Sequence, residues 1–130
     1  AAAMLVVCAS MIFAISAVIS FLNIVLSLFL YSSGLCILNP GVAFGVNTGL
    51  EVLISTVLII FLVILGIKRK RKDRYLLFSF SILGLSNLIV RVIYDGVCDY
   101  ISLFGLFFNL ADVFIVLVCI YIFYLLIKNR

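Results

Sequence analysis

The chain has 130 residues, of which 68% are hydrophobic and 11% are charged. Soluble globular domains have about a quarter of their residues charged, so this composition excludes a soluble fold and indicates an integral membrane protein. Nine basic and five acidic residues give a net charge of +4, and six of the bases lie between Lys68 and Arg74. No aromatic or polar surface surrounds this block, which argues against nucleic-acid binding.

The first predicted membrane span is the apolar stretch of residues 4–31, within fifty residues that carry no charge. A helix needs about 20 residues to cross a hydrocarbon core of about 30 Å. A cleaved signal peptide is the alternative, but the stretch lacks a basic n-region and exceeds the usual apolar core of about 7–15 residues. Asn23 interrupts the stretch, with Ser20 and Ser27 at helical spacing, so we expect all three to face neighbouring helices.

Residues 32–49 hold four of the eight glycines, the only proline and two asparagines, a composition typical of a loop. The second predicted span, residues 50–67, begins with Glu51 at the water boundary and ends at the basic block of residues 68–74. Because basic residues accumulate in cytoplasmic loops, this block predicts the orientation of the chain.

The third predicted span covers residues 75–94 and carries Asn87 and Arg91 in its outer half. These two residues are one helical turn apart and share a face. An arginine within a membrane needs a partner or water, so we expect Arg91 to pair with a carboxylate or with a lipid head group.

A short loop, residues 95–107, leads to the fourth predicted span, residues 108–127. This span begins with Asn109 and Asp112 and is otherwise apolar. An ionised Asp at the centre of a bilayer-spanning helix costs about 2.5–3.5 kcal/mol on insertion scales, so such a residue indicates a functional site.

Four crossings predict that both termini and the basic block lie in the cytoplasm and that loops 32–49 and 95–107 lie outside. The expected fold is therefore an all-α integral membrane protein, with residues 1–130 forming one domain, a bundle of four transmembrane helices. Polar groups from two helices and two loops then share the outer membrane boundary, which helix packing alone does not explain. They are Asn39, Asn87, Arg91, Asp99, Asn109 and Asp112.

The four cysteines are Cys8, Cys36, Cys98 and Cys119, and the chain has no CxxC pair and no histidine. A metal or haem site would have almost no ligands, so no metal or cofactor is expected. Cys36 and Cys98 fall in the two outer loops, which makes a disulfide between them feasible. The favoured interpretation is nevertheless that they are small apolar core residues.

Three motifs, in the same order along the chain, resemble those of one enzyme family. Residues 39–44, Asn-Pro-Gly-Val-Ala-Phe, are similar to its Asn-x-Gly-x-Ala-Phe segment. Residues 87–91 and 97–101 are similar to its Asn-x-x-Asp-Arg and Val-Asp-Phe-Ile motifs, and residues 108–112 match its Phe-Asn-x-Ala-Asp. The chain thus resembles the lipoprotein signal peptidase family, signal peptidase II, a four-span aspartyl protease of the bacterial cytoplasmic membrane.

This resemblance implies an aspartic endopeptidase that cleaves the signal peptide of diacylglyceryl-modified prolipoproteins at the outer face of the bacterial cytoplasmic (inner) membrane. It implies that Asp99 and Asp112 are the catalytic pair. The residues expected to position substrate or to hold the carboxylates are Asn39, Asn87, Arg91 and Asn109. The expected partners are the lipid-modified prolipoprotein and membrane lipid, with no cofactor, and the protein is expected to be monomeric.

The chain departs from the family pattern at several positions. Val90 stands where the family has the aspartate of Asn-x-x-Asp-Arg, and Asn23 and Ser27 are the nearest equivalents of an Asp and a Lys in the family's first span. Both outer loops are short, so we expect a reduced form of the small extracytoplasmic sheet. A catalytically silent family member is therefore one alternative.

The chemistry can also be considered without the family. Two carboxylates held close together cannot both ionise easily, so they share a proton, and such a pair can hydrolyse a peptide by general acid–base catalysis. Without histidine, Ser/His and Cys/His triads are excluded, and the lysines all lie on the cytoplasmic side. The other alternative is a small four-span transporter using Glu51, Asp99 and Asp112, but transporter sites usually lie near the midplane.

Overall fold

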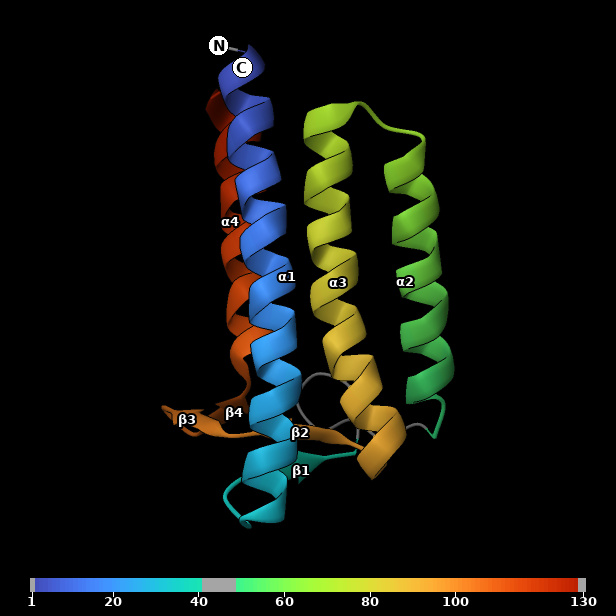
Figure 1. Ribbon diagram of the computed structural model, residues 1–130, viewed down its shortest axis with the longest axis vertical. Coiled ribbons are helices and arrows are strands. Elements are labelled where there is room, and N and C mark those ends of the chain that lie inside the picture. The colour runs from blue at the N-terminus through green and yellow to red at the C-terminus, as the bar shows by residue number, and fades with distance from the viewer. Residues whose placement is uncertain (1, 41–48, 129–130) are drawn as a thin grey trace.

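The computed structural model describes residues 2–40 and 49–128. Four helices dominate it: α1 (Ala2–Ser32), α2 (Glu51–Ile67), α3 (Arg71–Tyr94) and α4 (Leu110–Lys128) (Figure 1). Within the described residues, α1, α3 and α4 are long and apolar enough to cross a membrane, whereas α2, with 17 residues, is a shorter apolar helix. The protein is thus mostly helical, as the sequence predicts.

The largest difference from the predicted spans lies in the basic block. Helix α3 begins at Arg71 rather than near residue 75, with Asp73 in its first turn, where a negative charge stabilises the helix dipole. Arg74 reaches back to the last turn of α2, and its guanidinium donates to the carbonyl oxygens of Gly66 at 3.3 Å and Ile67 at 3.0 Å. The basic block is therefore a tight helix–helix turn in which Arg74 binds the last carbonyls of α2.

Helix α3 lies at the centre of the bundle and packs against α1, α2 and α4, while α1 and α4 also pack against each other (Figure 1). The buried polar residues of α1 face this packing, as the helical spacing of Ser20, Asn23 and Ser27 predicts. Small side chains allow close approach of helix backbones. The buried apolar core comprises Ala9, Leu76, Leu83, Ala111, Val118 and Leu125.

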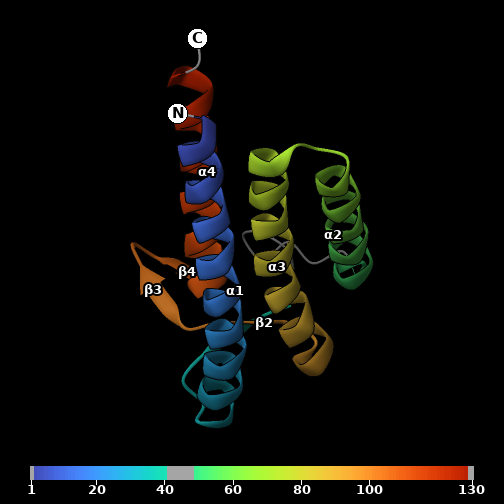
Figure 2. The same cartoon turned by 45° about the horizontal axis from the view of Figure 1, so that its top comes forward.

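Four short strands lie together at one end of the bundle (Figures 1 and 2). Strand β1 (Ile37–Asn39) pairs antiparallel with β2 (Val97–Asp99), and β3 (Ile101–Leu103) pairs antiparallel with β4 (Leu106–Phe108). The N-terminal end of α1, the C-terminal end of α4 and the α2–α3 turn lie at the opposite end (Figure 1). The two loops predicted to lie outside therefore meet at one end of the molecule.

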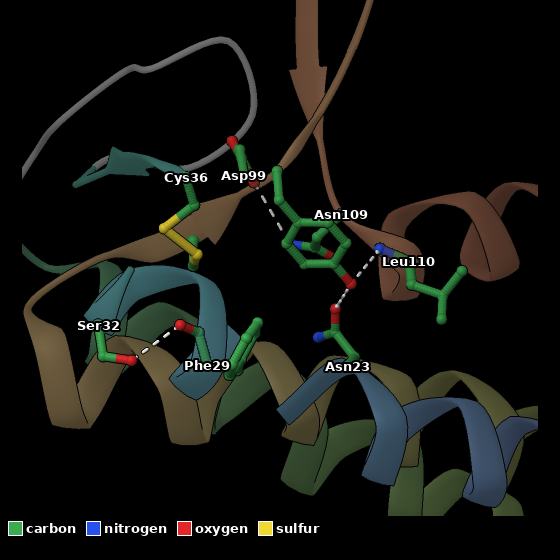
Figure 3. Close-up of a disulfide and its surroundings, with 9 residues drawn as sticks. Asn23, Phe29, Ser32, Cys36, Asp99, Asn109 and Leu110 are labelled. Carbon is green, nitrogen blue, oxygen red and sulfur yellow. Dashed lines mark hydrogen bonds between the residues drawn. A yellow bond between two sulfur atoms is a disulfide. The ribbon is translucent and has the colours of Figure 1, made fainter. Parts of the chain in front are cut away.

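Cys36 and Cys98, 62 positions apart in sequence, form a disulfide with Cα atoms 5.5 Å apart (Figure 3). The expectation that both are unpaired is therefore wrong. The pairing of β1 with β2 places Cys98 opposite Leu38, which brings Cys36 beside the same strand. Such a pairing between distant short strands leaves no periodic signal in the sequence. Cys8 and Cys119 are free.

Candidate active site

Asn109 contacts both aspartates of the predicted pair. Its side-chain Nδ2 donates to Oδ1 of Asp99 at 3.3 Å (Figure 3). Its backbone N–H donates to Oδ2 of Asp112 at 3.1 Å, and the backbone N–H of Asp112 donates back to Oδ1 of Asn109 at 3.1 Å. This reciprocal pair is a capping box that begins α4, and it explains why an amide and a carboxylate stand three residues apart there.

Asp112 is also held by α3. Nδ2 of Asn87 donates to Oδ1 of Asp112 at 3.2 Å. Each carboxylate oxygen of Asp112 thus accepts a hydrogen bond, one from Asn87 and one from the backbone of Asn109. These donors fix the orientation of the carboxyl group at the start of its helix.

Asp99 ends strand β2 and is buried. Burial, and next the charge of Asp112, raise the pKa of Asp99 from its ordinary 3.8 to about 6, while hydrogen bonds from Asn109 and Asn39 and the charge of Arg91 act in the opposite direction. In the antiparallel register Asn39 is opposite Val97, two residues before Asp99, so Asn39 and Asp99 are diagonal neighbours on the same face. Asp99 is therefore able to carry a proton near neutral pH.

Arg91 is buried at the end of α3, and its Nη1 donates to the carbonyl oxygen of Pro40 at 3.2 Å. It interacts electrostatically with Glu51, Asp99 and Asp112. The sequence places Glu51 at the water boundary, yet its side chain is buried at the start of α2 and accepts from the backbone N–H of Gly49 at 3.2 Å. Glu51 thus lies in one charged cluster with Arg91, Asp99 and Asp112, a grouping that the sequence suggests only in the transporter alternative.

Two further residues connect the strands to this cluster. The hydroxyl of Tyr100 donates to Oδ1 of Asn23 at 2.6 Å and accepts from the backbone N–H of Leu110 at 3.0 Å (Figure 3). Nδ2 of Asn23 in turn donates to Oδ1 of Asn87 and to Oγ of Ser86, both at 3.2 Å. Burial raises the pKa of Tyr100, so the phenol keeps the proton that it donates.

The sequence indicates Asn23 as a polar residue that faces other helices and as the nearest equivalent of an aspartate in the family's first span, but it does not single out Tyr100. The signal for Asn23 is its amide side chain, since the other polar residues inside this span are mainly serines, and its place at the family's aspartate position. Tyr100 offers a weaker signal, a hydroxyl where the family motif has Phe. Hydrogen bonds link Tyr100 through Asn23 and Asn87 to Asp112.

Comparison with known proteins decides the family. A family model described as signal peptidase (SPase) II matches residues 5–128, which include all four strands and, apart from the first three residues of α1, all four helices. The chain belongs to the signal peptidase II family. No curated protein and no solved structure matches the chain significantly. Signal peptidase II is a family of aspartic peptidases, and this family together with the apolar helices indicates that the chain is a multi-pass membrane protein.

In this member of the family, the six residues singled out in the sequence lie in one cluster at the strand end of the bundle. They are Asn39, Asn87, Arg91, Asp99, Asn109 and Asp112. Residues 41–44, the rest of the first motif, lie outside the described residues. Val90, at the family's aspartate position, is fully buried. Within the described ranges, no three Cys, Asp or Glu residues are grouped so as to hold a metal ion.

Proposed function

We propose that this protein is an aspartic endopeptidase that cleaves the signal peptide of diacylglyceryl-modified prolipoproteins at the outer face of the bacterial cytoplasmic membrane. The observation that carries the proposal is the position of Asn109, which hydrogen-bonds Asp99 with its side chain and Asp112 with its backbone. One residue thus holds two carboxyl groups in one small cluster, which is the arrangement that a shared-proton mechanism needs.

In this mechanism Asp99 and Asp112 share one proton. The ionised carboxylate removes a proton from a water molecule, which attacks the scissile carbonyl carbon, while the protonated carboxyl donates its proton to the carbonyl oxygen. The tetrahedral intermediate then breaks at the C–N bond, and the leaving nitrogen takes the proton that the base received. A pKa of about 6 for Asp99 allows the proton-carrying role close to neutral pH.

The other cluster residues then have positioning roles. Asn87 and Asn109 hold Asp112, and Asn39 and Asn109 hold Asp99. Arg91 places a cation beside both carboxyl groups, where it can balance their charge. The side-chain N–H groups of these asparagines and of Arg91 can also donate hydrogen bonds to substrate carbonyl oxygens.

We infer that all four helices cross the membrane and that the strand end faces outward. A helix of 17 residues, such as α2, is about 26 Å long and meets the lower limit of about 17 residues for a span. Disulfides persist in oxidising compartments, which supports an outward position for Cys36 and Cys98. The basic α2–α3 turn lies at the opposite end (Figure 1), as expected for the cytoplasmic side.

The position of the carboxyl groups favours a hydrolase over a transporter. Asp112 lies in the first turn of α4 and Asp99 ends a strand outside the bundle, whereas transporter sites usually lie near the midplane. A site at the outer end of the helices is where a membrane-anchored signal peptide leaves the bilayer. The geometry therefore suits cleavage at the membrane surface.

The proposal can be tested with the purified full-length protein and a diacylglyceryl-modified prolipoprotein. We expect cleavage that the family's cyclic depsipeptide inhibitor globomycin blocks, and no cleavage of the same precursor without the lipid. A folded protein that fails to cleave the modified precursor would be a silent family member. Cleavage that ignores both the lipid and the inhibitor would contradict the proposed specificity.

A further inference from the structure

The hairpin formed by β3 and β4 is apolar and exposed. Residues 101–108 contain no charged side chain. Phe104 at the tip is 94% exposed, and Leu103, Leu106 and Phe107 are 54%, 53% and 49% exposed. A single two-stranded hairpin is marginally stable in water, and a contiguous exposed apolar surface marks a site of interaction.

The exposed side chains lie on both faces of this hairpin. Leu103 pairs with Leu106, and Ser102 pairs with Phe107. Because neighbouring residues of a strand point to opposite faces, the two leucines lie on one face and Phe107 lies on the other. A protein partner docked on one face would leave the other apolar face in water. A lipid environment contacts both faces and the tip together.

The hairpin also lies at the right height for lipid. It projects sideways from the bundle near the level at which α2 and α4 begin, whereas the end of α1 continues beyond it (Figures 1 and 2). A single residue, Asn109, separates β4 from α4. The hairpin is therefore continuous with the exposed apolar surface of α4 that faces the bilayer.

The turn of the hairpin carries an aromatic residue, Phe104, in a left-handed backbone conformation that bulky residues rarely adopt. Phe104 has φ of 52° and Gly105 has φ of 78°. Left-handed conformations at both central positions of a hairpin favour Asn-Gly or Gly-Gly, and a bulky residue there is an outlier. Backbone strain of this kind persists where the side chain has a role, and here the side chain is the most exposed residue of the hairpin.

We propose that the β3–β4 hairpin inserts into the outer membrane interface, with Phe104 as its anchor among the lipid head groups and upper acyl chains. Aromatic side chains favour this layer. The hairpin joins β2 to α4, so its depth fixes the height of Asp99 and Asp112 relative to the membrane surface. The inference rests on the proposed membrane orientation and not on peptidase activity, so the two proposals can fail separately.

The chain contains no tryptophan, so Phe104→Trp creates a single fluorescent reporter. The full-length variant is reconstituted in phosphatidylcholine vesicles with bromine atoms placed high or low on the acyl chains. We expect high bromines to quench the Trp emission more than low ones, as for an aromatic ring about 5–10 Å into the boundary layer. Aqueous iodide should quench it weakly.

Two matched reporters bracket the result. Ser33→Trp lies in the exposed turn after α1 and should be quenched by iodide, and Ile120→Trp, exposed at the middle of α4, should be quenched best by low bromines. Leu106→Trp is a second hairpin reporter that should behave like Phe104→Trp. Iodide quenching of both hairpin reporters equal to that of Ser33→Trp would overturn the proposal. The proposal would also be overturned if neither bromine nor iodide quenched the hairpin reporters and their emission depended on the protein-to-lipid ratio. That result would indicate contact between copies of the protein.

Discussion

The hydroxyl of Tyr100 donates a 2.6 Å hydrogen bond to Oδ1 of Asn23 and so connects the strand region to the first helix beside the two aspartates. Asn23 donates to Asn87, which donates to Asp112. The same hydroxyl accepts from the backbone N–H of Leu110 in the first turn of α4. Tyr100 therefore acts on the site through its neighbours and is a positioning residue in our account.

Tyr100→Phe tests this role, because it keeps the ring and removes the hydroxyl. An unsatisfied buried polar group costs about 1–3 kcal/mol, and about 1.4 kcal/mol of transition-state stabilisation is tenfold in rate. We expect kcat to fall about tenfold with little change in KM. Tyr124→Phe, at the other end of α4, is the control and should match wild type. An unchanged kcat for Tyr100→Phe would mean that Asn87 holds Asp112 without help from the strand.

Substitutions of Asn109 can separate its two roles. Asn109→Ser keeps a side-chain oxygen that can cap α4 but removes the amide that donates to Asp99, whereas Asn109→Ala removes both, and loss of an N-cap costs about 1 kcal/mol. We expect Asn109→Ala to lower the melting temperature more than Asn109→Ser, and both to lower kcat. In wild type, the hydrogen bond from the Asn109 amide lowers the pKa of Asp99. Asn109→Ser lacks this bond, so its pH–rate profile should shift to higher pH. A profile that stays in place would show that the amide does not act on Asp99.

The raised pKa of Asp99 has a consequence for stability. Its folded-state value of about 6 lies above the ordinary 3.8, so the native state binds more protons than the unfolded state between these values. Stability therefore falls as pH rises through this window. We expect the melting temperature of wild type to rise on going from pH 7 to pH 4, and Asp99→Asn to be more stable than wild type at pH 7 but not at pH 4. Asp95→Asn, at an exposed position, should follow wild type at every pH.

The disulfide can be removed with Cys36→Ser and Cys98→Ser together. A loop of 62 residues gives about 4 kcal/mol in the chain-entropy description of disulfide stabilisation, so the melting temperature should fall clearly. Activity should fall as well, because the bridge ties β1, which ends with Asn39, to the strand that carries Asp99. Cys8→Ser with Cys119→Ser removes only free thiols and is the control. Equal melting temperatures for the two double variants would contradict a stabilising bridge.

Much of the bundle could be predicted from the sequence because long apolar stretches and a basic block are strong, local signals. The grouping of Asn109 with Asp112 could also be predicted, since the two residues stand three positions apart and lie within one helical turn. The pairing of Asp99 with Asp112 was implied by the family resemblance alone. The sequence predicts the start of α3 four residues too late, because a run of charged residues is typical of a solvent-exposed loop. In the structure Asp73 stabilises the first turn of α3 and Arg74 stabilises the turn before it.

The remaining features depend on contacts between segments distant in sequence. The disulfide requires the pairing of two three-residue strands, and three residues are too few to show an alternating pattern. The contact of Tyr100 with Asn23 spans 77 positions, and burial of Glu51 depends on the packing of α2 beside α3. Neither composition nor spacing carries that information.

The central claim is that Asp99 and Asp112 share the proton that cleaves the peptide bond, and the most direct measurement is cleavage of a diacylglyceryl-modified prolipoprotein by single Asp→Asn variants in purified form. Loss of a general acid–base group costs about 10²–10⁴-fold, so Asp99→Asn and Asp112→Asn should each lose that much kcat while remaining folded. Asp73→Asn and Asp95→Asn, at exposed positions, should cleave like wild type. Full cleavage by either Asp99→Asn or Asp112→Asn would contradict the two-carboxylate mechanism for this chain.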